Sequence, residues 1–405
     1  MPRIRIEEIS EGLYLLRVDD DRVRSFEAIW DVPEGATYNA YLLKTEEKTI
    51  LFDGWKRDYE SEFIEALKTL TRIEDIDYIV LHHTEPDHSG TLPKVLELNG
   101  YKAKVLGHSV AGRLVNGFYG LADKMDFHAV EDGEELNVGS ETLKFLHTPW
   151  LHWPDTICTY IEEERILLTG DAFGGFSMPG SIFDEGDMSE YMHYVKKYVV
   201  NVVGHYKQHI TKNTEKLKGI DVRMIAPMHG IIWKNDPGRI VSFYRDIAEG
   251  RVEEGKVLIV YDSMYGFVEG AIEHIMKRLS DKKVKVFKFT DREQDSLSEI
   301  LAEVPDSEAI VLGVSTYEAG AFPMMEFLAR QMAHKTDYRK PVLIVSSFGW
   351  GGAAARVIEG ILKETSFEMK GAVEYRGRVR DEDLRAIDGI LDMLFQGGEQ
   401  DTGNP

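Results

Sequence analysis

Short, wholly apolar segments alternate with helical segments along the chain, and this alternation limits the fold to the α/β classes. The clearest examples are KVLIVY, AIVLGV and PVLIVS, which are separated by amphipathic stretches such as GAIEHIMKRLSD. A strand without polar positions is covered on both faces, and strands joined by helices run parallel. We therefore expect a doubly wound parallel sheet over residues 253–395.

The first part of the chain mixes strand-like runs, such as LYLLRV, YNAYLLK and LKFLHT, with helical patterns such as YESEFIEALKTL. A charged segment around Gly250 and Gly255 separates this region from the parallel pattern. We predict one domain over residues 1–252, a second over 253–395, and a polar, disordered tail over 396–405.

Histidine and carboxylate side chains collect where strands of the first domain end. The run YIVLHHTEPDHSG places His83, Glu85 and Asp87 two residues apart, so that they project to one side of an extended loop. Three later apolar runs also end in His or Asp, and strand ends are where α/β sheets place their sites. Imidazoles and carboxylates that converge bind divalent metals. The predicted ligands are His83, Glu85, Asp87, His88, His152, Asp171 and His229.

Simpler readings exist for some of these residues. Asp87 could cap a helix that starts near Leu92. His147 and Asp155 are alternative candidates, with Asp155 able to orient a ligand imidazole. His82 is expected to point away from His83 and to play a structural role.

Three strand-end loops of the second domain combine small residues with aromatic ones. The loop after KVLIVY opens a helix, and backbone N–H groups at a helix N-terminus bind anions. Tyr317 and Trp350 could lie on a flat ring or simply cap the sheet. The candidate cofactor-binding residues are Ser263, Met264, Tyr265, Gly266, Ser315, Thr316, Tyr317, Gly349, Trp350 and Gly351.

The metal pattern resembles the metallo-β-lactamase fold, with Glu85 where the hydrolases of that fold carry a histidine. This variant, with LHWPD and GDAFG, is similar to the flavodiiron proteins. The resemblance implies an αββα sandwich that carries a diiron centre, followed by a flavodoxin-like domain. It assigns His83, Glu85 and His152 to one iron, Asp87, His88 and His229 to the other, and Asp171 to both. A carboxylate in place of an imidazole also favours iron over zinc.

The second domain resembles flavodoxin, which implies FMN as its cofactor. Ser263 and Gly266 match the usual phosphate loop, Tyr265 replaces a threonine, and Val268 stands where a hydroxyl is usual. Together the two resemblances imply an enzyme, a flavodiiron reductase that reduces dioxygen to water, nitric oxide to nitrous oxide, or both. Two ferrous ions and FMN hydroquinone hold four electrons, enough for one dioxygen.

The flavodiiron resemblance also implies a head-to-tail homodimer, or a dimer of dimers, that brings FMN and iron together across chains. A four-cysteine rubredoxin iron cannot be built from Cys158 alone. Electrons must therefore come from an external donor: a rubredoxin, a flavoprotein or a reduced deazaflavin. Two other functions stay open, a zinc-dependent hydrolase and a non-enzymatic electron-transfer or redox-sensing flavoprotein.

Composition argues against two classes of partner. With 48 Lys and Arg against 70 Asp and Glu, the formal charge is −22, which argues against nucleic acid and anionic membranes. No signal peptide and no membrane span are expected. We expect a soluble, cytoplasmic protein.

Overall fold

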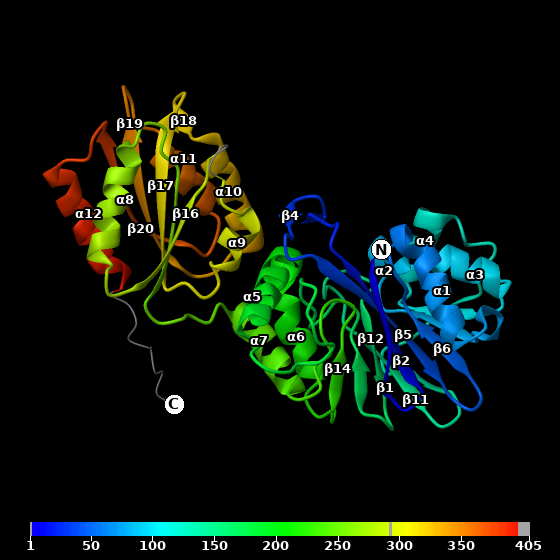
Figure 1. The fold of residues 1–405 in the computed structure, drawn as a ribbon. Coiled ribbons are helices and arrows are strands. Elements are labelled where there is room, and N and C mark those ends of the chain that lie inside the picture. Colours follow the sequence, from blue (N-terminus) through cyan, green and yellow to red (C-terminus); the bar gives the residue numbers. More distant parts are fainter. Residues whose placement is uncertain (1, 291–293, 396–405) are drawn as a thin grey trace. The chain divides into compact units, whose positions relative to one another are not determined.

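The computed structural model describes residues 2–290 and 294–395. The chain divides into two compact units, Met1–Arg245 and Asp246–Pro405 (Figure 1). The predicted tail, 396–405, lies outside the described residues.

The first unit contains two β-sheets. One runs in the order β1 (Arg3–Ser10), β2 (Leu13–Asp20), β5 (Ala36–Lys44), β6 (Thr49–Phe52), β7 (Tyr78–Leu81), β8 (Lys104–Gly107) and β9 (Phe127–Ala129). The other runs β10 (Glu135–Asn137), β11 (Thr142–His147), β12 (Ile157–Ile161), β13 (Ile166–Leu168) and β14 (Met224–Ala226). A short hairpin pairs β3 (Ser25–Phe26) with β4 (Trp30–Asp31).

Helices complete the first unit. Beside the first sheet lie α1 (Glu60–Leu70), α2 (Pro86–Ser89), α3 (Leu92–Asn99) and α4 (Ala111–Tyr119); beside the second lie α5 (Ser189–Tyr198), α6 (Lys207–Lys216) and α7 (Pro237–Glu249) (Figure 1). Two 3₁₀ turns, Arg57–Tyr59 and Ile73–Asp75, flank α1.

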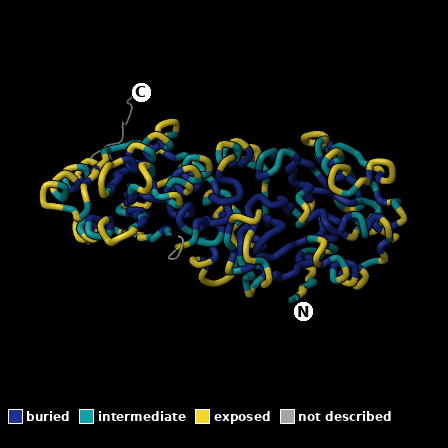
Figure 2. The backbone as a smooth tube through the Cα atoms, turned by 90° about the horizontal axis from the view of Figure 1, so that it is seen from above, coloured by how far each residue is buried: buried dark blue, intermediate teal, exposed yellow. Residues whose placement is uncertain are grey.

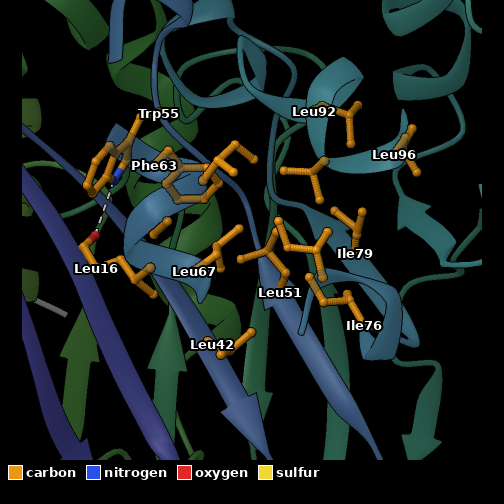
Figure 3. Packing of buried hydrophobic residues seen from close by; sticks show 14 of the residues in the cluster. Leu16, Leu42, Leu51, Trp55, Phe63, Leu67, Ile76, Ile79, Leu92 and Leu96 are labelled. Atoms are coloured by element: carbon orange, nitrogen blue, oxygen red, sulfur yellow. Dashed lines mark hydrogen bonds between the residues drawn. The ribbon is translucent and has the colours of Figure 1, made fainter. Parts of the chain in front are cut away.

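Two apolar cores hold these layers together. Between the sheets, Phe52 and Val80 pack with Phe145 and Ile157 of the second sheet. On the outer face of the first sheet, Trp55, Phe63 and Leu67 pack against Leu16 and Ile79, and the Trp55 indole donates to the Leu16 carbonyl at 3.2 Å (Figure 3). The predicted αββα sandwich is confirmed.

Residues 189–216 do not form one continuous helix. α5 ends at Tyr198, a π-helical turn covers Val199–Val203, a 3₁₀ turn covers Gly204–Tyr206, and α6 follows. The run VVNVVG combines β-branched residues and a glycine, which have low helix propensity. A π-turn inside a helix often accompanies a functional site.

The second unit is a parallel sheet in the order β16 (Lys283–Lys288), β15 (Lys256–Tyr261), β17 (Ala309–Tyr317), β19 (Pro341–Phe348) and β20 (Glu368–Arg376), with β18 (Gly320–Ala321) paired to β17. Its helices are α8 (Phe267–Arg278), α9 (Leu297–Ala302), α10 (Pro323–Lys335), α11 (Ala354–Leu362) and α12 (Asp381–Leu394). This is the flavodoxin strand order, so the predicted doubly wound sheet is confirmed.

Burial separates central from edge strands in the second unit. β15, β17 and β19 are almost wholly buried, whereas the edge strand β20 has only two buried residues, Val373 and Tyr375. Figure 2 shows the buried residues in the interior of each unit and the exposed ones mainly on its turns and outer helices. The sequence analysis did not predict β20, because its polar outer positions interrupt the apolar pattern.

Candidate metal centre and flavin pocket

All seven predicted ligands of the first unit lie together. His83 and Glu85 follow β7, and Asp87 and His88 belong to the short helix α2; His152, Asp171 and His229 follow β11, β13 and β14. The four imidazoles and Asp171 are buried, while Glu85 and Asp87 keep 12% and 14% of their side chains exposed. The cluster therefore reaches the surface along its carboxylates.

One oxygen of Asp171 faces the first group of ligands. Its Oδ2 lies 3.0 Å from His152 Nε2 and 3.5 Å from His83 Nε2. Glu85 Oε2 lies 3.0 Å from His152 Nε2 and 3.6 Å from His83 Nε2. Four side chains thus direct one atom each into a common space.

The other oxygen of Asp171 faces the second group. Its Oδ1 lies 2.9 Å from His88 Nε2 and 3.5 Å from His229 Nε2. Asp87 Oδ2 lies 3.3 Å from His88 Nε2 and 3.4 Å from His229 Nε2. The two imidazole Nε2 atoms are 3.0 Å apart.

The donor set fits two cations. Among the described residues, no Lys or Arg forms an ion pair with the three carboxylates; their charged partners are imidazoles. Buried polar atoms without a hydrogen-bond partner include both nitrogens of His83, both carboxylate oxygens of Asp87 and Glu85 Oε2. Buried polar atoms are rarely left unpaired unless an ion or water occupies the site.

The pKa values of the clustered side chains are shifted by their opposite charges. Burial lowers the pKa of His152 and of His229, but neighbouring carboxylates outweigh it and raise both to about 9. Burial raises the pKa of Glu85, but His152 and His83 outweigh it and lower this pKa to about 2. The cluster thus favours ionised carboxylates and added positive charge, which bound metal ions would provide.

Strand β5 holds the loop that carries His229. The Thr37 carbonyl accepts from His229 Nδ1 at 2.7 Å, which leaves Nε2 for the cluster. The Thr37 hydroxyl accepts from the Gly230 N–H at 2.6 Å, and the Tyr41 hydroxyl donates to the Pro227 carbonyl at 2.6 Å. Asn39 donates to both Pro227 and Gly230.

Three aromatic residues hold the loop that carries Asp171. The Tyr198 hydroxyl donates to the Asp171 carbonyl at 3.2 Å. The Trp233 indole donates to the Phe173 carbonyl, and the Tyr244 hydroxyl donates to the Gly174 carbonyl, both at 2.9 Å. Nothing in the sequence pattern singles out these residues, because they act through backbone groups of a distant loop.

The alternative residues lie outside the cluster. His82 contacts Asp53 through Nδ1 and Thr159 through Nε2. Asp155 accepts from the Thr84 hydroxyl at 2.7 Å, and no imidazole contact of it is found among the described residues. His147 Nε2 contacts the Val130 carbonyl at 2.9 Å. Helix α2 has Glu85 at its N-cap and α3 has Thr91, so Asp87 caps neither.

Aromatic side chains surround the cluster. Trp153 meets His83 and His152 edge to face, with ring centroids 6.2 and 6.3 Å apart. Tyr38 lies 5.5 Å from the His229 ring, and Phe26 lies 6.1 Å from it. The sequence analysis did not identify Tyr38 or Phe26, which precede the ligand motifs and belong to strands of their own.

A cavity of about 330 Å³ lies at the carboxyl ends of β15, β17 and β19 in the second unit. Nine of the ten candidate cofactor residues line it; Gly266 does not, and instead is the N-cap of α8 with φ +80°. The Trp350 and Tyr265 side chains are 88% and 80% exposed, and the buried Ser263 Oγ has no hydrogen-bond partner. Exposed flat rings beside a helix N-terminus fit a flavin that carries a phosphate.

None of the helices in the described part of the chain is long and apolar enough to cross a membrane.

Comparison with known proteins agrees with this architecture. Residues 36–230 match the model of the ODP family beta lactamases, and residues 259–387 match that of flavodoxin. A nitric oxide reductase of Moorella thermoacetica is 32% identical over 367 residues, which cover 89% of this chain and 90% of the relative.

Two solved structures have a similar fold over nearly the whole chain. A mutant of the flavo di-iron protein of Thermotoga maritima is 42% identical, with a TM-score of 0.92 over 97% of this chain and 99% of the other. The rubredoxin:oxygen oxidoreductase of Desulfovibrio gigas is 27% identical, with a TM-score of 0.91 over 96% and 98%. With both domains present in this order and nearly full coverage, the chain belongs to the flavodiiron protein family.

Proposed function

We propose that this chain is a flavodiiron oxidoreductase that reduces dioxygen to water, nitric oxide to nitrous oxide, or both. Relatives named for each reaction support the proposal, a nitric oxide reductase and a rubredoxin:oxygen oxidoreductase. The predicted diiron centre and FMN are the cofactors of this family.

The position of Asp171 is the observation on which the proposal rests. Its two oxygens face two different groups of ligands, so one carboxylate can contact two metal ions. We assign His83, Glu85 and His152 to one iron and Asp87, His88 and His229 to the other. Glu85 makes the site harder and more anionic than a histidine would, which favours iron over zinc and argues against the hydrolase alternative.

The chain itself binds, orients and shields the cofactors. When bound, two ferrous ions and FMN hydroquinone supply four electrons, which reduce one dioxygen to two waters; two electrons suffice to convert two nitric oxide molecules to nitrous oxide. Thr37 fixes the orientation of His229, and Tyr198 fixes the backbone of Asp171. Trp153, Tyr38 and Phe26 exclude water from the imidazole side of the cluster.

In the second domain, we propose that residues 263–266 hold the FMN phosphate and that the other two loops hold the isoalloxazine. The domains would then be residues 1–252 for the diiron centre and 253–395 for FMN. We further propose an external electron donor, which is a rubredoxin, a flavoprotein or a reduced deazaflavin. A cytoplasmic location and a head-to-tail homodimer, alone or paired with a second dimer, complete the proposal.

Anaerobic stopped-flow spectroscopy tests the reaction. The purified protein is photoreduced and then mixed with dioxygen or nitric oxide, while flavin absorbance reports oxidation. Rapid flavin reoxidation by at least one oxidant, with water or nitrous oxide as product, supports the proposal. Flavin that stays reduced with both oxidants, or hydrogen peroxide as the sole product, refutes it.

A further inference from the structure

Adjacent loops of the flavin pocket are fastened to one another by side chains. The Thr316 hydroxyl accepts from the N–H groups of Ala353 and Ala354, both at 3.2 Å, and so ties the second loop to the third. The Ser347 hydroxyl donates to the Gly377 carbonyl at 2.9 Å. Thr316 and Ser347 belong to the last residues of β17 and β19, so these contacts tie the end of β17 to the segment after β19, and the end of β19 to the segment after β20.

Asp262 makes the corresponding link between the first and second loops. It is the first residue after β15, and its backbone N–H donates to the Gly313 carbonyl at 3.0 Å. Its Oδ1 accepts from the backbone N–H of Ser315 at 2.8 Å. The carboxylate therefore joins the start of loop 263–266 to the carboxyl-terminal end of β17 at Ser315, and both segments line the cavity.

The chemistry of Asp262 is unusual for a surface loop. The residue is 0% exposed, and its Oδ2 has no hydrogen-bond partner within the described parts of the chain. Burial raises the pKa of the carboxyl to about 6, although the hydrogen bond from Ser315 opposes this. A buried carboxyl with one oxygen left without a hydrogen-bond partner destabilises a domain, so its presence at this point indicates a role in the pocket.

We infer that Asp262 is a positioning residue for FMN: it sets the spacing between the loop that holds the phosphate and the carboxyl-terminal end of β17, which holds the flavin ring. FMN would contact both segments at once, so its affinity depends on that spacing. The requirement is for an acceptor at the Oδ1 position, because the Ser315 N–H is otherwise buried without a partner. This inference rests on the FMN binding proposed above.

The test measures the Kd of FMN for deflavinated protein by quenching of flavin fluorescence, at pH 7. Asp262→Ala leaves the Ser315 N–H unpaired and should raise the Kd about tenfold to a hundredfold. Asp262→Asn keeps an acceptor oxygen and should bind FMN within about threefold of the wild type. If Asp262→Ala does not fold, Asp262→Leu gives the same comparison with a side chain of similar volume.

Asp306→Ala is the matched control, since Asp306 pairs with Lys256 at 2.7 Å at the opposite end of the same sheet. It should leave the Kd of FMN unchanged. Asp262→Ala with wild-type affinity, or Asp262→Asn as weak as Asp262→Ala, would overturn the inference while the proposed function stands. A wild-type protein that takes up no FMN would instead overturn the proposed function.

Discussion

At the residue scale, each imidazole of the metal centre serves one side of Asp171. His152 approaches the Oδ2 side, where it also contacts Glu85. Replacing His152 by Ala removes one of the four proposed ligands of a single iron and should reduce the iron content by about half or more, because metal affinity depends on the full ligand set. FMN content should stay at the wild-type level, since the flavin loops belong to the other unit.

His147→Ala is the control for that experiment. His147 lies five residues earlier, contacts the Val130 carbonyl and is outside the cluster. Plasma mass spectrometry of both variants, purified anaerobically, gives the comparison. Equal iron content in His152→Ala and His147→Ala would show that His152 is not a ligand.

Lys340 is a buried charge whose effect should depend on pH. It is 2% exposed and donates to the Gly250 carbonyl at 3.0 Å; burial lowers its pKa to about 8, with Lys256 adding to this and Asp306 opposing it. The pKa of Lys340 is lower in the folded protein than in the unfolded chain. Burying the charged lysine therefore lowers the free energy of unfolding by its full amount below pH 8. This loss disappears as the pH rises toward the pKa of the unfolded chain. Lys340→Met should therefore stabilise the protein at pH 7 by about 1–3 kcal/mol.

Thermal unfolding by calorimetry between pH 7 and 9.5 measures this effect. The difference in Tm between Lys340→Met and the wild type should become smaller as the pH rises above 8. Lys340→Arg keeps its charge over the whole pH range, so the difference in Tm between Lys340→Arg and Lys340→Met should stay constant. If the difference in Tm between the wild type and Lys340→Met also stays constant with pH, the pKa of Lys340 is not lowered.

At the element scale, strand β5 orders the His229 loop through side chains that are all buried. Thr37→Val removes the acceptor of the Gly230 N–H, and an unpaired buried donor costs about 1–3 kcal/mol of unfolding free energy. The variant should also release iron faster to a chelator, because the loop that presents His229 loses one anchor. Thr37→Ser keeps the hydroxyl and should behave as the wild type; equal iron release from all three proteins would rule out this anchoring role.

The elements that could be predicted best are those whose residues form a recognisable pattern within a short stretch of sequence. The apolar runs of β7, β13 and β14 and the His, Asp and Glu residues after them stand out in the sequence, so the cluster could be predicted. The support from Thr37, Asn39 and Tyr41 could not, because these residues precede the loop they hold by 186 to 192 positions. The role of Tyr198 could not be predicted either, because its hydroxyl binds a backbone carbonyl of the distant Asp171 loop.

At the scale of the whole molecule, the order of domains was predictable because the two halves differ in their pattern of apolar and polar residues. Fully apolar strands joined by helices require a parallel sheet, and the flavodoxin strand order confirms it. The contact between Asp262 and Ser315 was not predictable, because Ser315 belongs to a different strand, β17. Packing between strands that are distant in the sequence determines such contacts, and a single sequence does not show which distant residues meet.

The central claim is that one chain carries two irons and one FMN. The most direct measurement is the metal and flavin content of protein expressed with iron and purified without oxygen, by plasma mass spectrometry and by absorbance of the released flavin. The account predicts about two irons and one FMN per chain, from the ligand set and the flavin pocket described above. Zinc in place of iron, in protein expressed with iron supplied, would contradict the account and favour a hydrolase.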